Sequence, residues 1–350
     1  MTLPFFRRVS SIRLPFSIAA SRQKRNWTGS GPLAFGLSLA GLLAASSLLN
    51  RYLSHKAERD HPAEGQFITV RGVKIHYVEK GHGPVVMMLH GNGSALQDFL
   101  CSGIVDRLAG KHRVLVFDRP GFGHTRRPKD LNWTPEEQAS LFADALTKLG
   151  VSEPVVVGHS WGTLVALALA QDPRLACRGL LLASGYYLPT PRLDIMAGSI
   201  GAVPFLGPLL CHTVLPLLAR ASWPAMVRNL FAPRGTETFA AFPKELTFRP
   251  SQISASAQET AILNPAVTGL ARRSRGFRIP IKFMAGTGDQ VVDANHSAKF
   301  HRHLPGSTIE LVPLQGHMLH HTARARVISA VEEITYPAIA KYNNVEDQGE

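Results

Sequence analysis

The sequence has few cysteines, and they do not stand in a pattern that binds metal or forms disulfides. Among 350 residues there are three, which are far apart and lie in apolar stretches: Cys101, Cys177 and Cys211. Cysteine metal sites and disulfide frameworks need closely spaced, paired cysteines. We therefore expect buried free thiols, and no metal site built from them.

The sequence also lacks the charge pattern of a nucleic-acid-binding protein. Its formal net charge is +13, but residues 1–61 hold nine lysines and arginines against two acidic residues. The rest of the chain has no basic stripe interleaved with aromatic side chains. Nucleic-acid binding is therefore not expected. The length suits one large domain with an insertion, and an apolar content of 45% is ordinary for a globular enzyme.

Charge is absent from one segment near the front of the chain, between Asn26 and Asn50. Six basic residues precede it, and residues 32–49 are nearly all leucine, alanine, glycine, serine and phenylalanine. Such a segment is long enough to cross a bilayer as a helix. We expect a membrane anchor at about residues 32–49, inside a basic leader and linker that cover residues 1–61, with polar residues 51–65 forming the linker.

Two other interpretations of this front segment stay open. Ala44-Ala45-Ser46 resembles a signal-peptide cleavage site, although the basic region before the apolar core is unusually long. A basic, acid-free leader also suits an organelle presequence. If the segment is a single-pass anchor, the positive charge before it favours a cytoplasmic N-terminus and places the domain that follows it on the non-cytoplasmic side. Cleavage of a signal would instead export the protein.

The strongest chemical signal lies between Val155 and Gly162. A run of β-branched residues predicts a buried strand, the pattern Gly-x-Ser-x-Gly follows, and an alanine-rich helix begins at once. This arrangement is typical of a nucleophile elbow, in which a strained turn exposes the oxygen of Ser160. Gly158 has no Cβ, so strand and helix can pass close together. The amide of Trp161 is then directed at an oxyanion formed on a carbon that Ser160 attacks.

Strands alternate with helices along the chain, which predicts a parallel sheet covered on both faces. The expected strands, after a hairpin at residues 66–78, are residues 85–89, 113–117, 155–157, 179–183, 281–285 and 308–312. The expected helices are residues 95–110, 135–150, 163–171, 293–300 and 323–333.

Two glycine-containing turns follow the early strands. The first is HGNGS, in which the backbone amide of Asn92 is a candidate second oxyanion donor, although glycine and asparagine also suit a plain turn. The second is DRPGFGH. Its Asp118 precedes the nucleophile in the chain, so we expect it to brace the loop and not to serve as a catalytic acid.

Together, HGNGS, DRPGFGH and GHSWG resemble the α/β-hydrolase fold family, and the likeness covers about residues 65–335. The resemblance implies a mostly parallel, eight-stranded sheet built from residues 62–187 and 277–340. It also implies a helical cap at residues 188–276, where the sequence is apolar and rich in proline. An apolar cap favours an apolar acyl or alcohol group in the substrate, although packing of the cap on the core explains the same residues. Cap and span could also meet the membrane surface together.

The resemblance implies the positions of a catalytic acid and base as well. It places the acid at Asp289, just beyond a strand, whereas the rival Asp293 has the position of a helix N-cap. It places the base at His317, in a Gly-His pair after the last strand. His320 and His321 are close rivals that fall on or near the next helix.

The nucleophile separates this chain from relatives with other chemistry. Epoxide hydrolases and haloalkane dehalogenases of this fold attack with a carboxylate, whereas residue 160 is serine, which favours acyl transfer. We expect a serine hydrolase that cleaves a carboxylic ester of an apolar small molecule through an acyl-enzyme, with no metal or organic cofactor. The alternatives are a C–C bond hydrolase or a cofactor-free perhydrolase on the same triad, and a catalytically silent member that binds an apolar ligand or partner through its cap. The sequence predicts no oligomeric state.

Overall fold

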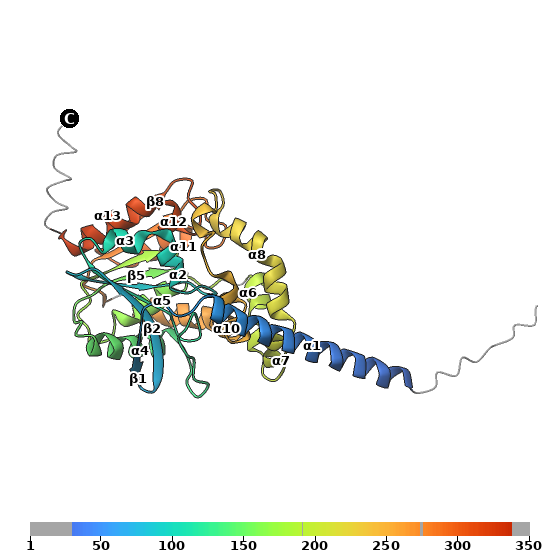
Figure 1. The fold of residues 1–350 in the computed structure, drawn as a ribbon. Coiled ribbons are helices and arrows are strands. Elements are labelled where there is room, and N and C mark those ends of the chain that lie inside the picture. The colour runs from blue at the N-terminus through green and yellow to red at the C-terminus, as the bar shows by residue number, and fades with distance from the viewer. Residues whose placement is uncertain (1–29, 191, 274–275, 338–350) are drawn as a thin grey trace, which may run out of the picture. The chain divides into compact units, whose positions relative to one another are not determined.

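The computed structural model describes residues 30–190, 192–273 and 276–337 (Figure 1). The chain divides into two units, residues 1–42 and residues 43–350. The basic residues expected before the membrane span lie outside the described residues, as do residues 338–340 of the expected core.

The first described element is a long helix, α1 (Ser30–Asp60). Its stretch Leu33–Asp60 is long and apolar enough to cross a membrane, a property that suits an anchor or a signal sequence. The helix runs past the expected span, so residues 51–60, which we expected to form a linker, are helical instead. Tertiary contacts explain the difference, because Asn50 and Ala57 are buried where this part of α1 packs within the second unit.

The second unit contains an eight-stranded sheet in the order β1-β2-β4-β3-β5-β6-β7-β8. The strands from β3 to β8 pair in parallel, whereas β1 and β2 pair antiparallel and join the sheet at one edge. The expected mostly parallel, eight-stranded sheet is confirmed. The strands are β1 (Gln66–Val70), β2 (Val73–Lys80), β3 (Val85–Leu89), β4 (Arg113–Phe117), β5 (Val155–His159), β6 (Gly179–Ala183), β7 (Ile281–Gly286) and β8 (Thr308–Val312).

Alternation along each strand produces two apolar cores, one on each face of the sheet. In β5, Val156 belongs to the core shared with α4 (Pro135–Lys148) and α5 (Gly162–Leu169), whereas Val155 and Val157 belong to the core shared with α3 (Ile104–Leu108) and α13 (Arg324–Thr335). The helices outside the segment between β6 and β7 are α2 (Gln97–Ser102), α3 (Ile104–Leu108), α4 (Pro135–Lys148), α5 (Gly162–Leu169), α11 (Asn295–His301), α12 (Leu319–Thr322) and α13 (Arg324–Thr335).

One expected helix is divided in the structure. Residues 95–110 form α2 and α3, with Gly103 between them at φ 74°. Glycine adopts this left-handed conformation without a steric penalty and ends the first helix there. The expected start of α4 is confirmed, because Thr134 accepts a hydrogen bond from the amide of Glu137 at 3.2 Å.

Helices fill the segment between β6 and β7, which we call the insertion (residues 193–273). Its residues Phe231, Phe239 and Phe242 form an apolar cluster with Met318, next to the expected base. The three cysteines are free, with Cys101 half-buried and the other two buried. The insertion contains α6 (Leu193–Gly198), η1 (Ile200–Ala202), α7 (Leu206–His212), α8 (Leu215–Phe231), η2 (Glu237–Phe239), α9 (Lys244–Thr247) and α10 (Pro250–Arg273).

Candidate active site

Ser160 occupies a strained turn between β5 and α5. Its φ angle is 53°, a conformation that side chains other than glycine rarely adopt. The flanking glycines are sterically required: a Cβ on Gly158 would lie 2.7 Å from Cα of Thr163, and one on Gly162 would clash with the carbonyl of Leu89. The backbone geometry of a nucleophile elbow is therefore present at the expected residues.

Asp289 and His317 meet beyond the ends of β7 and β8. Nδ1 of His317 lies 2.8 Å from Oδ2 of Asp289, and both side chains are buried. The other carboxylate oxygen accepts hydrogen bonds from the amides of Val291 and Val292 at 2.8 and 2.9 Å. Because these bonds fix the carboxylate, it holds the proton of His317 on Nδ1 and leaves Nε2 as the basic nitrogen.

His159 links the loop that carries His317 to the turn that carries Ser160. Its Nε2 lies 3.1 Å from the carbonyl oxygen of His317, and the two rings are 4.8 Å apart. Burial and the neighbouring histidines hold the pKa of His159 well below its usual value. Oγ of Ser160 makes no hydrogen bond to a described residue. The structure thus joins Asp289 to His317, and brings His317 beside the residue that precedes Ser160.

The loop after β3 approaches the serine closely. A Cβ on Gly91 would lie 3.0 Å from Cβ of Ser160 and 3.5 Å from its Oγ. Within the described part of the chain, the backbone amides of Asn92 and Trp161 donate to no protein acceptor. Both expected oxyanion donors are therefore unpaired amides. Trp161 directly follows Ser160, and Asn92 directly follows Gly91, which lies close to Ser160.

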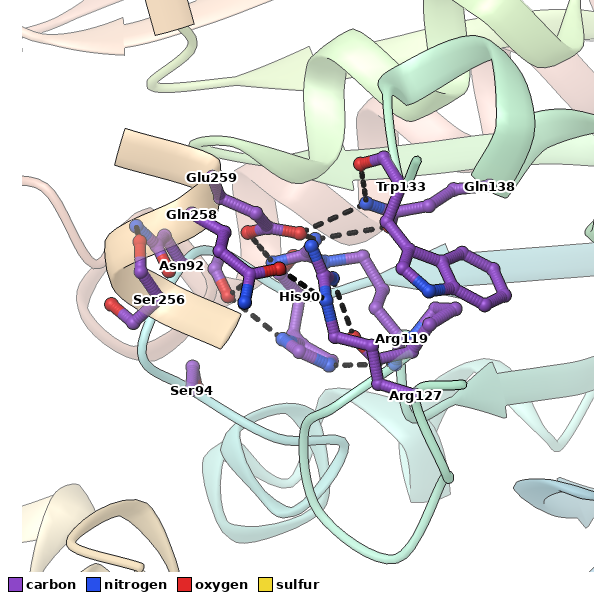
Figure 2. Close-up of polar contacts among 12 residues, drawn as sticks. His90, Asn92, Ser94, Arg119, Arg127, Trp133, Gln138, Ser256, Gln258 and Glu259 are labelled. Atoms are coloured by element: carbon purple, nitrogen blue, oxygen red, sulfur yellow. Dashed lines mark hydrogen bonds and ion pairs between the residues drawn. The ribbon is translucent and has the colours of Figure 1, made fainter. Parts of the chain in front are cut away.

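A buried arginine determines the orientation of this loop (Figure 2). Nε of Arg119 donates to the carbonyl of His90 at 2.8 Å, and Nη2 donates to that of Gly91 at 2.9 Å. In a trans peptide the carbonyl and the following N–H point in opposite directions. Since the carbonyl of Gly91 points toward Arg119, the N–H of Asn92 points away from it.

Arg119 is itself held by an acid of the insertion. Its guanidinium pairs with both carboxylate oxygens of Glu259 on α10, and neither side chain is exposed to solvent. Gln138 of α4 bridges the pair, accepting from Arg119 at 3.2 Å and donating to Glu259 at 2.9 Å. Asn92 contacts the same helix, since its Nδ2 donates to the carbonyl of Ser256 at 3.1 Å. The insertion is thus connected to the candidate oxyanion loop (Figure 2).

His90 is held in its neutral form beneath that loop. Its Nδ1 donates to the carbonyl of Gly91 at 2.8 Å, and its Nε2 accepts from the amide of Arg119 at 3.0 Å. Complete burial, with Arg119 beside it, lowers the pKa of His90 from 6.5 to about 3. A proton on Nε2 would also break the second of these bonds.

Asp118 braces the loop, as we expected. Its carboxylate accepts from the amides of Leu96 and His124, each at 2.8 Å, and contacts Nδ1 of His76 at 2.6 Å. Burial opposes ionisation, but the bond from His76 and these amides hold the pKa of Asp118 below its usual range. Asp293 is exposed and accepts from the amide of Asn295 at the start of α11, in keeping with a capping role.

The rival histidines bind a different acid. Nε2 of His320 and Nε2 of His321 lie 2.9 and 2.8 Å from Oδ1 of Asp98, which is fully buried. Burial raises the pKa of Asp98, but its contacts with His320 and His321 outweigh that effect and hold it well below the usual range. Sequence reasoning missed Asp98, because 222 residues separate it from His320.

One group of side chains has the composition of a metal site. Among the described residues, Asp98, His159 and His320 place ligand atoms within 4.8 Å of one another. The atoms of Asp98 and His320 that meet are already hydrogen-bonded at 2.9 Å. The arrangement is therefore explained by a buried hydrogen-bond network behind the loop of His317.

Two shallow pockets lie outside the candidate site. Their volumes are about 400 and 380 Å³, and both are lined by Arg234, Gln315 and Thr322. Neither is lined by Ser160, which is only 8% exposed. The serine is thus covered in this structure.

Comparison with known proteins identifies the fold family. The family described as "alpha/beta hydrolase fold" matches residues 84–323. Haloalkane dehalogenase 2 of Mycobacterium tuberculosis is 28% identical over 139 residues, which is 40% of this chain and 48% of the dehalogenase. The chain thus spans about half the length of that relative. An uncharacterized protein of the same organism is 28% identical over 291 residues, covering 79% of this chain and 83% of that protein.

Solved structures with other activities share the fold. An epoxide hydrolase superposes with a TM-score of 0.65 at 20% identity, over 78% of this chain and 99% of its own. An esterase from Thermogutta terrifontis gives 0.62 at 22% identity, over 77% and 97%. A membrane phospholipase A gives 0.60 at 19% identity, over 87% and 95%. From the family match, and from the sheet order that accompanies it, the chain belongs to the α/β-hydrolase fold family.

Proposed function

We propose that this chain is a serine hydrolase that cleaves a carboxylic ester of an apolar small molecule through an acyl-enzyme. The observation that carries the proposal is the 2.8 Å contact between Asp289 and His317, where His317 lies beside His159, the residue before a serine whose φ angle is 53°. In a nucleophile elbow the strained turn exposes the serine oxygen, and an imidazole oriented by a carboxylate activates its hydroxyl.

In this mechanism Nε2 of His317 removes the proton of Ser160 as its Oγ attacks the ester carbon. Asp289 keeps the imidazole in the required tautomer and stabilises its charged form. The amides of Asn92 and Trp161 bind the oxyanion, and each contributes about 3 kcal/mol to transition-state stabilisation. The protonated imidazole gives its proton to the leaving alcohol. Water then attacks the acyl-enzyme by the reverse route, and no metal or organic cofactor takes part.

The identity of residue 160 supports ester cleavage over the reactions of some relatives. Displacement of a halide or opening of an epoxide by this fold proceeds through an alkyl ester on a carboxylate nucleophile, and this chain has a serine at that position. Esterases are among the structural neighbours. The oxyanion donors that we propose would serve a carbonyl substrate.

We further propose that α1 anchors the enzyme in a membrane, with its catalytic domain on the non-cytoplasmic side. The proposed division is a leader, anchor and linker in residues 1–61, a hydrolase core in residues 62–187 and 277–340, and a cap in residues 188–276. The apolar helix α1 supports the anchor. Export after signal cleavage is the alternative, and detection of residues 30–60 in the mature membrane-bound protein would exclude it.

Labelling with a fluorophosphonate probe tests the function. The full chain should react, and Ser160→Ala should not. Ser184→Ala is a matched control, because Ser184 is also buried at a positive φ of 50°. This variant should keep the labelling of the wild type. Equal labelling of wild type and Ser160→Ala would reject the proposal. If only Ser160 is labelled but no ester is cleaved in a panel from short to long acyl chains, a C–C hydrolase on the same triad is favoured over an esterase.

A further inference from the structure

The insertion contains a stretch that is free of formal charge. From Ile195 to Ala219 the sequence has no aspartate, glutamate, lysine or arginine. In the structure this stretch covers most of α6, all of η1 and α7, and the start of α8. Surface helices of soluble domains usually carry charged residues on their outer face, so the absence of charge here needs an explanation.

Large apolar side chains of this stretch face outward. Phe205 is 96% exposed and has a φ angle of 62°, so a strained backbone presents an aromatic ring to the surroundings. Exposed apolar groups of this extent mark a surface that contacts a membrane, a protein partner or a ligand. The other exposed members in and beside the stretch are Leu193, Met196, Ile200, Val203, Leu206, Leu209, Val214, Leu217 and Leu218.

The shape of this stretch fits the surface of a bilayer better than its full thickness. Ile195–Ala202 and Leu206–His212 together are apolar enough for a membrane segment, but they bend by 98° at the break between them. A bent pair of this kind does not form a straight span. It can bury its outer face to the depth of the headgroup and acyl-chain boundary, as amphipathic interfacial helices do.

The same stretch is fastened to α1. Oγ of Ser46 donates to the carbonyl of Thr213 at 2.8 Å, and Nδ2 of Asn50 donates to the same carbonyl at 2.7 Å and to that of His212 at 3.2 Å. Both donors belong to the unit of residues 43–350 and bind carbonyl groups at the C-terminal end of α7. The apolar stretch is therefore held at Ser46 and Asn50 by α1, the helix that we propose as the anchor.

We propose that the surface formed by α7 and the turn at Phe205 enters the interfacial layer of a lipid bilayer. The occupant of this surface is acyl chain and headgroup. A polar partner would not suit the stretch, because it carries no formal charge. The inference rests on the proposed anchor, because α1 keeps this surface at the membrane. It also identifies the substrate class more closely: an ester that resides in the bilayer would meet the insertion without crossing water.

Depth measurements on the full chain in phosphatidylcholine vesicles test this proposal. A Cys101→Ser background leaves two buried cysteines, so an NBD fluorophore can be attached to Phe205→Cys alone. Leu314→Cys is the matched control, because Leu314 is also exposed, at 66%, with a positive φ of 56°. Fluorescence is quenched by doxyl-labelled lipid from within the bilayer, and by iodide from the water.

At residue 205 we expect quenching by doxyl lipid, and iodide quenching about tenfold weaker than at residue 314. Equal access of iodide at the two positions, in protein that floats with the vesicles, would overturn the surface but leave the anchor standing. Protection from iodide without quenching by lipid would indicate a protein partner, such as a second copy, and would also overturn it. Protein that does not float would overturn both surface and anchor.

A double substitution separates this surface from the catalytic proposal. Phe205→Ser with Leu206→Ser should lower the rate on a vesicle-embedded ester about tenfold and leave the rate on a soluble short-chain ester unchanged. An equal effect on both esters, or no effect on either, would contradict supply of substrate through the surface. A wild-type protein that does not react with the fluorophosphonate probe would contradict the serine mechanism instead.

Discussion

Arg119 and Glu259 form an ion pair from which water is excluded, and the pair connects the loop after β4 to helix α10 of the insertion. The same guanidinium binds the carbonyls of His90 and Gly91. One side chain thus contacts both the insertion and the loop that carries a candidate oxyanion donor, so the position of the insertion and the geometry of that loop are coupled.

Removal of the acid from this pair should be costly. Glu259→Ala leaves the guanidinium of Arg119 buried without a counter-charge, which should lower the free energy of unfolding by about 3 to 5 kcal/mol. Urea denaturation measures the change. Glu153→Ala is the control, because its pair with Arg178 is exposed and should change stability little. Similar losses in the two variants would show that burial of the Arg119 pair has no special effect.

Replacement of the arginine should affect turnover more than binding. Arg119→Lys keeps the positive charge but cannot reach both carbonyls and the carboxylate at once. The amide of Asn92 then loses its fixed direction, and kcat on a soluble ester should fall on the order of tenfold to a hundredfold. KM should change much less, because the amide acts on the transition state. A rise in KM with kcat unchanged would argue against this positioning role.

The two candidate acids can be told apart by amide substitutions. Asp289→Asn should lower kcat on the order of ten-thousandfold, because the amide favours the wrong tautomer of His317. Asp293→Asn should leave kcat near that of the wild type, since Asp293 is exposed and bonds to the start of α11. Steady-state kinetics on one soluble ester checks both variants. Retained activity in Asp289→Asn would show that Asp289 is not the catalytic acid. Loss of activity in Asp293→Asn would favour Asp293 instead.

Stability should depend on pH through His90. The pKa of this side chain is about 3 in the folded protein against 6.5 ordinarily, so between these values the unfolded chain binds a proton that the folded chain does not. The contribution of His90 to the free energy of unfolding is therefore complete above pH 6.5 and is lost as the pH falls toward about 3. The slope is about 1.4 kcal/mol per pH unit.

His90→Gln should remove this dependence, because the amide oxygen accepts from the Arg119 amide and does not titrate. Denaturation at a series of pH values gives the free energy of unfolding of the wild type and of His90→Gln. The difference between these two free energies should narrow as the pH falls. His82→Gln, at an exposed position, is the matched control and should follow the wild type. A constant gap between wild type and His90→Gln would show that His90 does not change its proton affinity on folding.

Local signals in the sequence predicted most of the fold and the placement of the candidate site. The N-cap at Thr134 and the helix stop at Gly150 depend on the residue present at each position, and the positive φ at Ser160 accompanies the Gly-x-Ser-x-Gly turn. The resemblance to the α/β-hydrolase fold family implied the acid and base positions, and short apolar runs located the strands that they follow. The contact of Asp289 with His317 was predictable for this reason.

Features that depend on long-range packing were not predictable. The partner of Arg119 lies 140 residues further along the chain, and that of Asp98 lies 222 residues further, and nothing near Arg119 or Asp98 identifies either partner. The continuation of α1 to Asp60 depends in the same way on burial of Asn50 against the end of α7. Sequence patterns report the period of burial along an element, but not which distant side chain completes a buried polar pair.

We propose above all that Ser160 carries the acyl group during turnover, and trapping that intermediate tests this proposal most directly. The full chain is mixed with p-nitrophenyl butyrate, quenched in acid during the burst of p-nitrophenol, digested and analysed by mass spectrometry. We expect one butyryl group, on the peptide that contains Ser160. Release of p-nitrophenol without an adduct, or with the adduct on another residue, would contradict it.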